Sequence, residues 1–387
     1  MTHSGAGAVD EGASPWFERQ EYLDRVRRLQ RVMRSLGIEA LLAFQPESVT
    51  WLTGFFTRGY STFQFAFVPA EGEPSVFCRD VARYYLERTS VFGGHGVWAD
   101  GDDRFAAAAS FVRAKLSGAR RVAAELDAWQ MTAQRYLALK AALPEIDLID
   151  ADGAVAKLRL IKSPAEIAYQ RRAAKAAEAG MQAALDTARA GVSEREVGAA
   201  IVAAMIRAGS DHPGPGPLSS GERAFHLHGG FTDRVLRRGD TLQCETTPAV
   251  KHHHARFMRT IKIGAASQLE EAKLQAIIEV QDTALAAVRS GVAASIPDAI
   301  YRDGILGRGL RKDYTNKTFY SIGLMMPPVG GEALEAAPGA TWTFEPGMVF
   351  HTYVLADSFG FSETIAITET GFERLTQFPR RLFVTPG

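Results

Sequence analysis

Helical and extended hydrophobic patterns alternate along the first half of the chain. A helical period runs from about Arg19 to Leu36, ends at Gly37, and is followed by an apolar run from Ala40 to Phe44 that predicts a strand. Shorter elements continue the alternation, with strands expected at 64–68, 122–124 and 146–149, one helix at 103–116 and another from 129 onward. This order indicates an α/β domain that ends near 158.

Two capping boxes mark helix starts in the second half. Ser163 and Glu166 surround Pro164 at the first helical position, and Ser193 with Glu196 repeats the arrangement. In each pair the serine hydroxyl and the glutamate satisfy backbone N–H groups of the first turn. The pattern predicts helices from 164 to near 191, from 194 to near 209, and from about 269 to 290.

Stretches rich in β-forming residues separate these helices, at 241–245, 255–263, 341–354 and 363–368. Such an arrangement predicts helices packed on a curved, mainly antiparallel sheet, so the second half is expected to be α+β and not doubly wound. At 387 residues the chain exceeds the usual single-domain size of roughly 100 to 200 residues. We expect a disordered start at 1–15, a first domain at 16–158 and a second at 159–387.

Charge and cysteine content narrow the possible partners. Lys plus Arg and Asp plus Glu each number 44, so no net charge attracts nucleic acid or an anionic membrane. Cys78 and Cys244 are too few for a disulfide framework and fit free, buried thiols of a reducing compartment. The start has no signal-peptide pattern, and no apolar run approaches the roughly 18 residues of a membrane span. We expect a cytoplasmic protein that binds a small molecule, with no nucleic acid or membrane partner.

Six short motifs follow one another along the chain, and their order and spacing carry more information than any one of them. They are WLTGF (51–55), KSPAEIAYQRRAA (162–174), RRGDTL (237–242), IGL (322–324), FEPGMVF (344–350) and SETIAIT (362–368). Across nearly the whole chain this series resembles the superfamily of creatinase, prolidase and aminopeptidase P. The resemblance implies a C-terminal pita-bread catalytic domain, an N-terminal α/β creatinase-like domain, and a homodimer.

Peptidases of this superfamily bind two divalent metal ions through two Asp, one His and two Glu, and the metals lower the pKa of a bridging water. By the resemblance, four of these positions are occupied here by Glu245, Arg256, Tyr320 and Tyr353, and the last Glu is retained as Glu363. A guanidinium has no acceptor and repels cations, so this set cannot form the two-metal cage. The resemblance therefore implies neither a metal nor another cofactor.

Metal-free members of the superfamily, creatinase and ectoine hydrolase, open non-peptide carbon–nitrogen bonds, and the chain is more similar to ectoine hydrolases. The shared features are the length after WLTGF, the segment HHHARFMRT, Tyr320-Ser-Ile-Gly-Leu with Pro327-Pro328, EPGMVFH with His351, and the ending FPRRLFV. Three stretches differ, at 55–64, 356–362 and 226–230. Because these stretches are expected to line the pocket, the identity of the substrate stays open.

Glu245 is the first candidate for the catalytic nucleophile or general base, because its position faces the cavity in relatives. We expect Arg256 to bind substrate and to lower the pKa of Glu245, which keeps it ionised; a structural ion pair of the two is the alternative. Cys244, its neighbour on the strand, is expected to face the core. Glu363 is the second candidate catalytic carboxylate, since a carboxylate pair suits an amidinium-like substrate through bidentate hydrogen bonds.

Histidines are the candidates for protonating the leaving nitrogen. His226 and His228 lie where relatives carry a histidine that shuttles protons or orients substrate; counting back from Asp240 favours His228 as the catalytic residue, and the preceding aromatic favours His226. Surface positions are the alternative for both. In the run 252–254, consecutive side chains of a strand point to opposite faces and cannot converge on a metal. We expect a hairpin tip there, with His254 directed inward to bind substrate.

Further substrate contacts are expected from Tyr320, Tyr353 and His351, where the tyrosines either donate hydrogen bonds or fill space that metals occupy in relatives. Arg58 and Tyr60 follow WLTGF in the loop that reaches the partner's pocket in creatinase-like dimers; a solvated loop is the alternative.

The prediction is a metal-independent hydrolase of a non-peptide carbon–nitrogen bond in a small cyclic amidine or guanidine-like compound, with ectoine or a related compatible solute first among substrates. One alternative is an Xaa-Pro metallopeptidase, which Arg256, Tyr320 and Tyr353 oppose. The other is a pita-bread protein that binds partners without catalysis, which has no need of the carboxylates Glu245 and Glu363.

Overall fold

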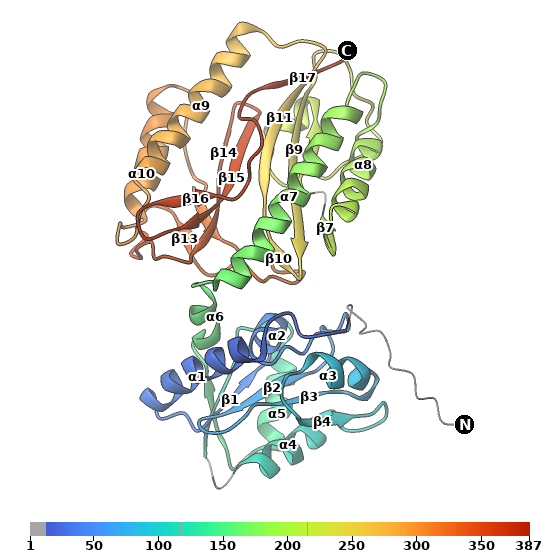
Figure 1. The fold of residues 1–387 in the computed structure, drawn as a ribbon, viewed down its shortest axis with the longest axis vertical. Coiled ribbons are helices and arrows are strands. Elements are labelled where there is room, and N and C mark those ends of the chain that lie inside the picture. The colour runs from blue at the N-terminus through green and yellow to red at the C-terminus, as the bar shows by residue number, and fades with distance from the viewer. Residues whose placement is uncertain (1–12, 117, 119, 215) are drawn as a thin grey trace, which may run out of the picture. The chain divides into compact units, whose positions relative to one another are not determined.

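The computed structural model describes residues 13–116, 118, 120–214 and 216–387, so most of the expected disordered start lies outside the described residues. Ala13, at the edge of that start, is buried. The chain divides into two compact units, the first ending at Leu158 and the second running from Arg159 to Gly387 (Figure 1). No helix among the described residues is long and apolar enough to cross a membrane.

The first unit is built on a six-stranded sheet in the order β4-β3-β2-β1-β5-β6. Its strands are β1 (Ala40–Ala43), β2 (Phe65–Pro69), β3 (Ser75–Arg79), β4 (Gly94–Trp98), β5 (Arg121–Ala124) and β6 (Asp147–Asp150). β1 runs parallel to β5 and β5 parallel to β6, whereas β2 runs antiparallel to both β1 and β3. All four residues of β1 are buried, which accounts for its unbroken apolar run, because a central strand covered on both faces has no polar side.

Helices of the first unit are α1 (Arg19–Ser35), α2 (Pro46–Thr53), α3 (Arg83–Thr89), α4 (Arg104–Lys115), α5 (Ala133–Ala142) and α6 (Ala154–Arg159). The helix expected from 129 begins four residues later, because the Thr132 hydroxyl accepts a hydrogen bond from the backbone N–H of Arg135 and caps α5 there. Together these helices and strands confirm a mixed helix and strand domain.

The second unit contains two sheets. The first has the order β10-β9-β11-β17, with two further strands on β9, and consists of β7 (His212–Gly214), β8 (Leu218–Ser220), β9 (Thr241–Val250), β10 (His253–His254), β11 (Phe257–Ile263) and β17 (Phe383–Thr385). The second has the order β13-β12-β14-β15-β16 and consists of β12 (Phe319–Ser321), β13 (Glu335–Ala336), β14 (Val349–Ala356), β15 (Phe359–Ile367) and β16 (Phe372–Arg374). Only the β11–β17 pair among these is parallel, so the mainly antiparallel α+β prediction is confirmed.

Side-chain hydroxyls join the two sheets where β11 meets β15. The backbone N–H of Met258 donates to Ser362 Oγ over 2.7 Å, and that of Arg256 donates to Thr364 Oγ1 over 2.8 Å. These backbone donors, which no ladder satisfies, are thus paired with side chains. The seam brings the inner faces of β9 and β11 next to those of β14 and β15.

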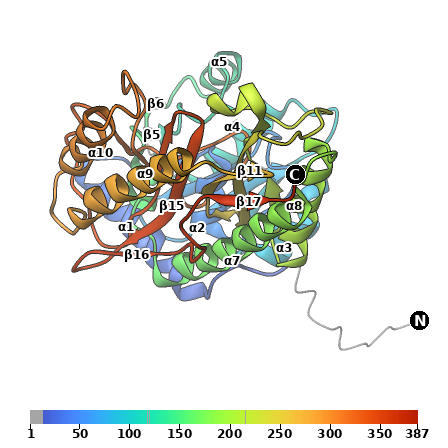
Figure 2. The same ribbon diagram turned by 90° about the horizontal axis from the view of Figure 1, so that it is seen from above.

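Four long helices cover the sheets: α7 (Pro164–Thr187), α8 (Glu194–Arg207), α9 (Gln268–Ala286) and α10 (Ser295–Gly307). Seen from above, α7 and α8 lie on the side of β11, and α9 and α10 on the side of β15 (Figure 2). Both predicted capping boxes are formed, at Ser163 and Ser193. The sequence pattern missed α10, whose Pro297 and Gly304 lower its helix propensity.

Candidate functional site

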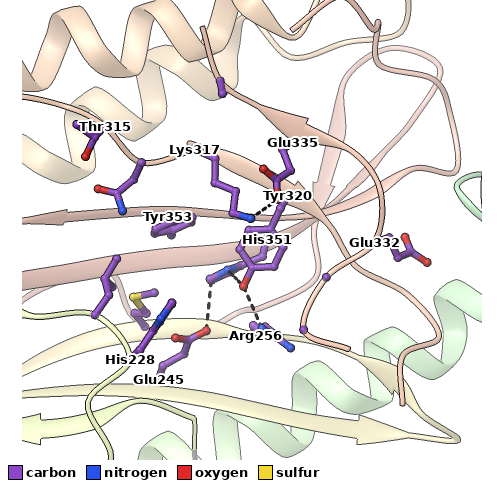
Figure 3. Close-up of a pocket in the computed structure, with 16 residues that line it drawn as sticks. His228, Glu245, Arg256, Thr315, Lys317, Tyr320, Glu332, Glu335, His351 and Tyr353 are labelled. Atoms are coloured by element: carbon purple, nitrogen blue, oxygen red, sulfur yellow. Dashed lines mark hydrogen bonds and ion pairs between the residues drawn. The ribbon is translucent and has the colours of Figure 1, made fainter. Parts of the chain in front are cut away.

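A cavity of about 860 Å³ opens in the second unit between side chains of both sheets. Six predicted site residues line it together, namely His228, Glu245, Arg256, Tyr320, His351 and Tyr353 (Figure 3). Sequence reasoning missed three further charged residues of its lining, Lys317, Glu332 and Glu335.

Glu245 faces the cavity because of strand alternation on β9. Cys244, one residue before it, packs in the core between the sheet and α7 and α8, as predicted. The Glu245 side chain is nearly enclosed, with a residue exposure of 4%. Its backbone neighbour across the ladder is Met258 of β11, which also lines the cavity.

Burial raises the pKa of Glu245 to about 7, and the nearby Arg256 offsets this rise only in part. The prediction that Arg256 keeps this carboxyl below its usual range is therefore wrong, because removal from water outweighs the attraction of the guanidinium. Nor do the described residues show an ion pair within 4.0 Å between the two side chains. A carboxyl that is half ionised near neutral pH suits a general base or nucleophile.

A chain of hydrogen bonds leads from Arg256 toward Glu245 (Figure 3). Arg256 Nη1 donates to the Tyr320 hydroxyl over 3.0 Å, and that hydroxyl lies 2.8 Å from His351 Nδ1. Nε2 of the same imidazole lies 2.7 Å from Ser362 Oγ and 3.9 Å from Glu245 Oε1. The two sheets thus contribute to one polar network.

The positions of the protons in this series of hydrogen bonds follow from its first donor, the Arg256 guanidinium. Because the Tyr320 oxygen accepts from Arg256, its own O–H is directed at His351 Nδ1, which leaves Nε2 as the N–H donor. Burial and the nearby guanidinium hold the pKa of His351 well below its usual range, so the ring is neutral. The network therefore directs the Nε2–H of a neutral imidazole at Ser362 Oγ, with Glu245 Oε1 3.9 Å from the same nitrogen.

Aromatic and charged residues complete the lining. The Tyr353 ring stacks on His351 at a centroid distance of 5.5 Å and an interplanar angle of 9°, and burial raises its pKa to about 12. Lys317 pairs with Glu335 and lies 5.1 Å from the centroid of the Tyr320 ring. Glu332 pairs with the buried Lys162. No motif marks these residues, although Glu335 stands opposite Tyr320 in the β12–β13 ladder.

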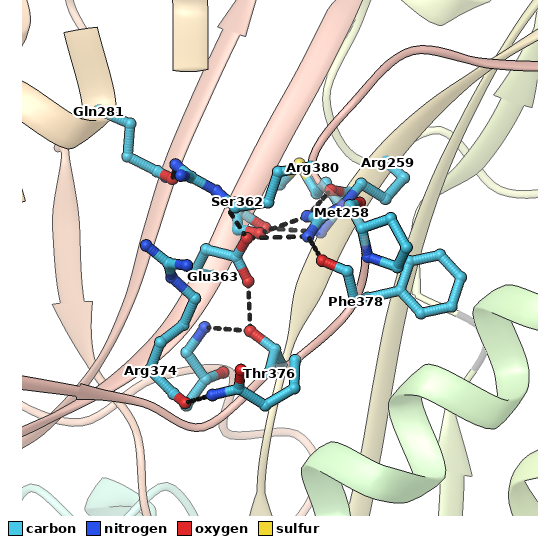
Figure 4. A network of polar contacts seen from close by, with 12 residues as sticks. Met258, Arg259, Gln281, Ser362, Glu363, Arg374, Thr376, Phe378 and Arg380 are labelled. Atoms are coloured by element: carbon cyan, nitrogen blue, oxygen red, sulfur yellow. Dashed lines mark hydrogen bonds and ion pairs between the residues drawn. The ribbon is translucent and has the colours of Figure 1, made fainter. Parts of the chain in front are cut away.

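Glu363 does not lie in the cavity, and its predicted role as the second catalytic carboxylate is corrected. It is fully buried in a separate network, where Arg259 Nη2 donates to it over 2.8 Å, the Thr376 hydroxyl also donates, and Arg380 Nε lies 3.5 Å away (Figure 4). These contacts hold β11, β15 and the C-terminal segment together.

Glu363 points away from the cavity because side chains alternate between the two faces of β15. Ser362 stands opposite Tyr353 in the β14–β15 ladder and shares a face with it, since its hydroxyl contacts His351. The next residue, Glu363, points to the other face. The residue that faces the His351 network is therefore Ser362, one residue before the carboxylate that the motif suggested.

Of the histidines, His228 lines the main cavity and His226 lines a smaller surface pocket beside it. Both residues are exposed, and His228 has a positive φ of 67°. His254 lies in a second pocket that shares Arg256 with the main cavity. His253 stacks on Tyr169 of α7, so the run does alternate between faces. All of 252–254 are buried, and of these three His254 lines that pocket, so its role in binding substrate stays a prediction.

Arg58 and Tyr60 belong to the first unit. Arg58 is exposed, whereas Tyr60 is partly buried with its ring centroid 6.5 Å from that of Phe56, and burial raises its pKa. Neither lines the cavity of the second unit, and their contribution to a partner's site stays a prediction.

Both units of the chain match models of known protein families. Residues 168–369 match the model of metallopeptidase family M24, and residues 25–161 match the creatinase/prolidase N-terminal domain. An uncharacterized hydrolase/peptidase of Sinorhizobium fredii, y4tM, is 29% identical over 387 residues, covering 95% of this chain and 98% of that protein. Ectoine hydrolase of Halomonas elongata is 28% identical over 406 residues, covering 95% and 98%.

The fold also matches solved structures. Dipeptidase PepE of Mycobacterium ulcerans superimposes with a TM-score of 0.83 at 23% identity, covering 96% of this chain and 100% of that one. The prolidase of Pyrococcus horikoshii superimposes with a TM-score of 0.80 at 21% identity, covering 92% and 99%. The predicted resemblance, and the predicted N-terminal creatinase-like and C-terminal pita-bread domains, are confirmed.

The cavity does not offer the ligands that a two-metal site needs. Five side chains stand in place of the expected metal cage, namely Glu245, Arg256, Tyr320, Tyr353 and Ser362. Of these five, Glu245 alone is a carboxylate. Within the described residues, no group of three or more His, Cys, Asp or Glu is arranged to hold a metal ion. A guanidinium at a ligand position opposes cation binding.

Proposed function

This chain belongs to metallopeptidase family M24, and we propose that it is a hydrolase that opens a non-peptide carbon–nitrogen bond without a metal ion. The observation that carries the proposal is the network beside Glu245, in which Arg256, Tyr320 and His351 line the cavity and connect to one another. The proposed substrate is a small cyclic amidine or guanidine-like compound, of which ectoine is the first candidate. The similarity to an ectoine hydrolase supports this choice.

The chemistry follows from the charges in the cavity. A carboxylate at Glu245 attracts a cationic amidinium and holds its carbon in the reach of water. The same carboxylate either takes a proton from that water or attacks the carbon itself. One C–O bond forms, one C–N bond breaks, and the nitrogen leaves with a proton, so that one water is consumed overall. General base catalysis of this kind contributes typically about 10²- to 10⁴-fold in rate.

The Arg256 guanidinium, which the Tyr320 hydroxyl holds in the cavity lining, is the proposed donor that stabilises the charge that develops. Removing one such donor typically costs about 3 to 4 kcal/mol of transition-state stabilisation. His228, which lines the cavity from its exposed loop, is the proposed acid for the departing nitrogen.

The test is turnover measured by mass spectrometry with ectoine, creatine and an Xaa-Pro dipeptide, each with chelator and with added manganese. We expect chelator-resistant cleavage of ectoine or creatine that falls at least 100-fold in Glu245→Gln and is unchanged in the surface control Glu279→Gln. Manganese-dependent cleavage of the dipeptide contradicts the proposal and supports a metallopeptidase.

We also propose that the protein acts as a cytoplasmic homodimer in which Arg58 and Tyr60 reach the partner's substrate. Mixing two inactive variants, Glu245→Gln and Arg58→Ala, then restores up to about a quarter of the wild-type activity, because one site of a mixed dimer receives both intact residues. Unchanged inactivity of the mixture, or a monomer in sedimentation, contradicts this assignment.

A further inference from the structure

A second pocket of about 220 Å³ adjoins the main cavity along β9. Thr247 lines it, two residues beyond Glu245, and alternate residues of a strand share one face at a spacing of about 7 Å. Arg256 lines both pockets. The remaining lining comes from His212, Gly214, His254 and the segment 327–329.

Among the described residues, no carboxylate forms an ion pair with the guanidinium shared by the two pockets, and Glu245 acts on it only at longer range. Arg256 Nη1 donates to a neutral hydroxyl, that of Tyr320, and its Nε is buried without a hydrogen bond to any described residue. No carboxylate of the described chain lies within 4.0 Å of it. A cation held in this way is complemented by an anion from outside the chain, because desolvated charge is costly unless paired.

His254 adds an acceptor to the same pocket. Its Nε2 lies 3.1 Å from the carbonyl oxygen of Met325, which can only accept, so Nε2 carries the hydrogen. Burial holds the pKa of His254 well below its usual range, and the ring is neutral. Its buried Nδ1 is then a lone-pair acceptor, and it makes no hydrogen bond to the described residues.

We propose that this second pocket binds the carboxylate end of an amino-acid-derived substrate, with Arg256 holding the carboxylate and His254 Nδ1 accepting a neighbouring N–H of the substrate. The inference rests on the proposed function for the bond that is broken, and it narrows the substrate class. Neutral or purely cationic amidines lack the anion, whereas a cyclic amidine that carries a carboxylate reaches both Arg256 and the scissile position beside Glu245.

Calorimetric titration of the wild-type protein with matched acids and amides tests the carboxylate. The probes are proline with prolinamide, and ectoine with its carboxamide. We expect each acid to bind at least tenfold more tightly than its amide, and this preference to disappear in Arg256→Gln and persist in the exposed control Glu279→Gln. Equal affinity of acid and amide for the wild type, or no binding of either acid, overturns the proposal, even where Arg256→Gln fails to fold.

A third probe tests the N–H contact. N,N-dimethylproline keeps the carboxylate but has no N–H. We expect the wild-type protein to bind it at least fivefold more weakly than proline, and His254→Phe to bind the two compounds with equal affinity. Retention of the difference in His254→Phe overturns the assignment to His254. Failure of the proposed function is separate: an acid preference without chelator-resistant turnover leaves the pocket assignment intact, and turnover without an acid preference refutes only the pocket.

Discussion

Replacing Glu245 by glutamine is expected to stabilise the protein at alkaline pH while abolishing its activity. The carboxyl has a pKa of about 7 in the folded protein, against 4.5 for an unfolded glutamate. Below 4.5 both states hold the proton and Glu245 imposes no cost. Between these values the unfolded state releases its proton first, so wild-type stability falls as pH rises, and the loss is complete above about 7.

The magnitude follows from the size of the shift. A difference of about 2.5 pKa units at about 1.4 kcal/mol per unit corresponds to roughly 3 kcal/mol. Because Glu245 is nearly enclosed, with an exposure of 4%, solvent screening reduces this figure little. Glutamine has nearly the same shape and no charge to desolvate. Glu245→Gln is therefore expected to equal the wild type near pH 4.5 and to exceed it by up to about 3 kcal/mol at pH 8.

Scanning calorimetry between pH 5 and 8 measures this difference. For a unit of this size, 3 kcal/mol corresponds to roughly 6 to 12 °C in Tm. Glu279→Gln, an exposed glutamate on α9, provides the control and is expected to show no such trend. A stability difference that is constant with pH, or that grows toward acid, refutes the argument that burial controls this carboxyl.

Three further substitutions test the packing around the site and in the first unit. Glu363→Gln leaves a buried guanidinium without its carboxylate and is expected to cost about 3 to 5 kcal/mol in urea unfolding, whereas Glu373→Gln, in an exposed ion pair, is expected to cost less than about 1 kcal/mol. Ser163→Ala removes the cap of α7 and is expected to cost about 1 kcal/mol in the same assay; no change contradicts the capping box. Gly54→Ala places a Cβ 2.5 Å from a backbone carbonyl oxygen at φ +80° and is expected to lower Tm more than Gly101→Ala, which has a similar φ and open space around it; equal losses contradict the clash.

The residues at the positions that the resemblance assigns to metal ligands give the cavity a mixed electrostatic character. Arg256 supplies a fixed positive charge where relatives are expected to bind cations. It donates a hydrogen bond to Tyr320, whose hydroxyl in turn contacts His351 beside Glu245. In the proposed function, this site stabilises negative charge through N–H donors and not through a Lewis acid. Its carboxyl is also less acidic than usual, which makes it a stronger base near neutral pH.

Local chemistry and motif order sufficed for much of the fold. The capping boxes at Ser163 and Ser193 depend on residues three positions apart, so their sequence predicts the helix starts directly. The series of motifs predicted the resemblance to a two-domain family, because each short motif lies at a turn or strand whose local backbone geometry favours particular residues. Elements without such signals were missed, as α10 shows: its Pro297 and Gly304 are tolerated because the helix packs against α9 and the core beneath it.

The sequence also determined which residue types stand at most of the positions that the resemblance assigns to metal ligands, including Glu245, Arg256, Tyr320 and Tyr353. It did not determine which face of β15 carries the chemistry, because Ser362 and Glu363 are adjacent and a shift of one residue exchanges the two faces of a strand. Only the tertiary structure decided that Glu363 stabilises the core. It also set the pKa of Glu245, since burial depends on residues distant in the chain that enclose it, and it joined Arg256 to a second pocket built from segments more than a hundred residues apart.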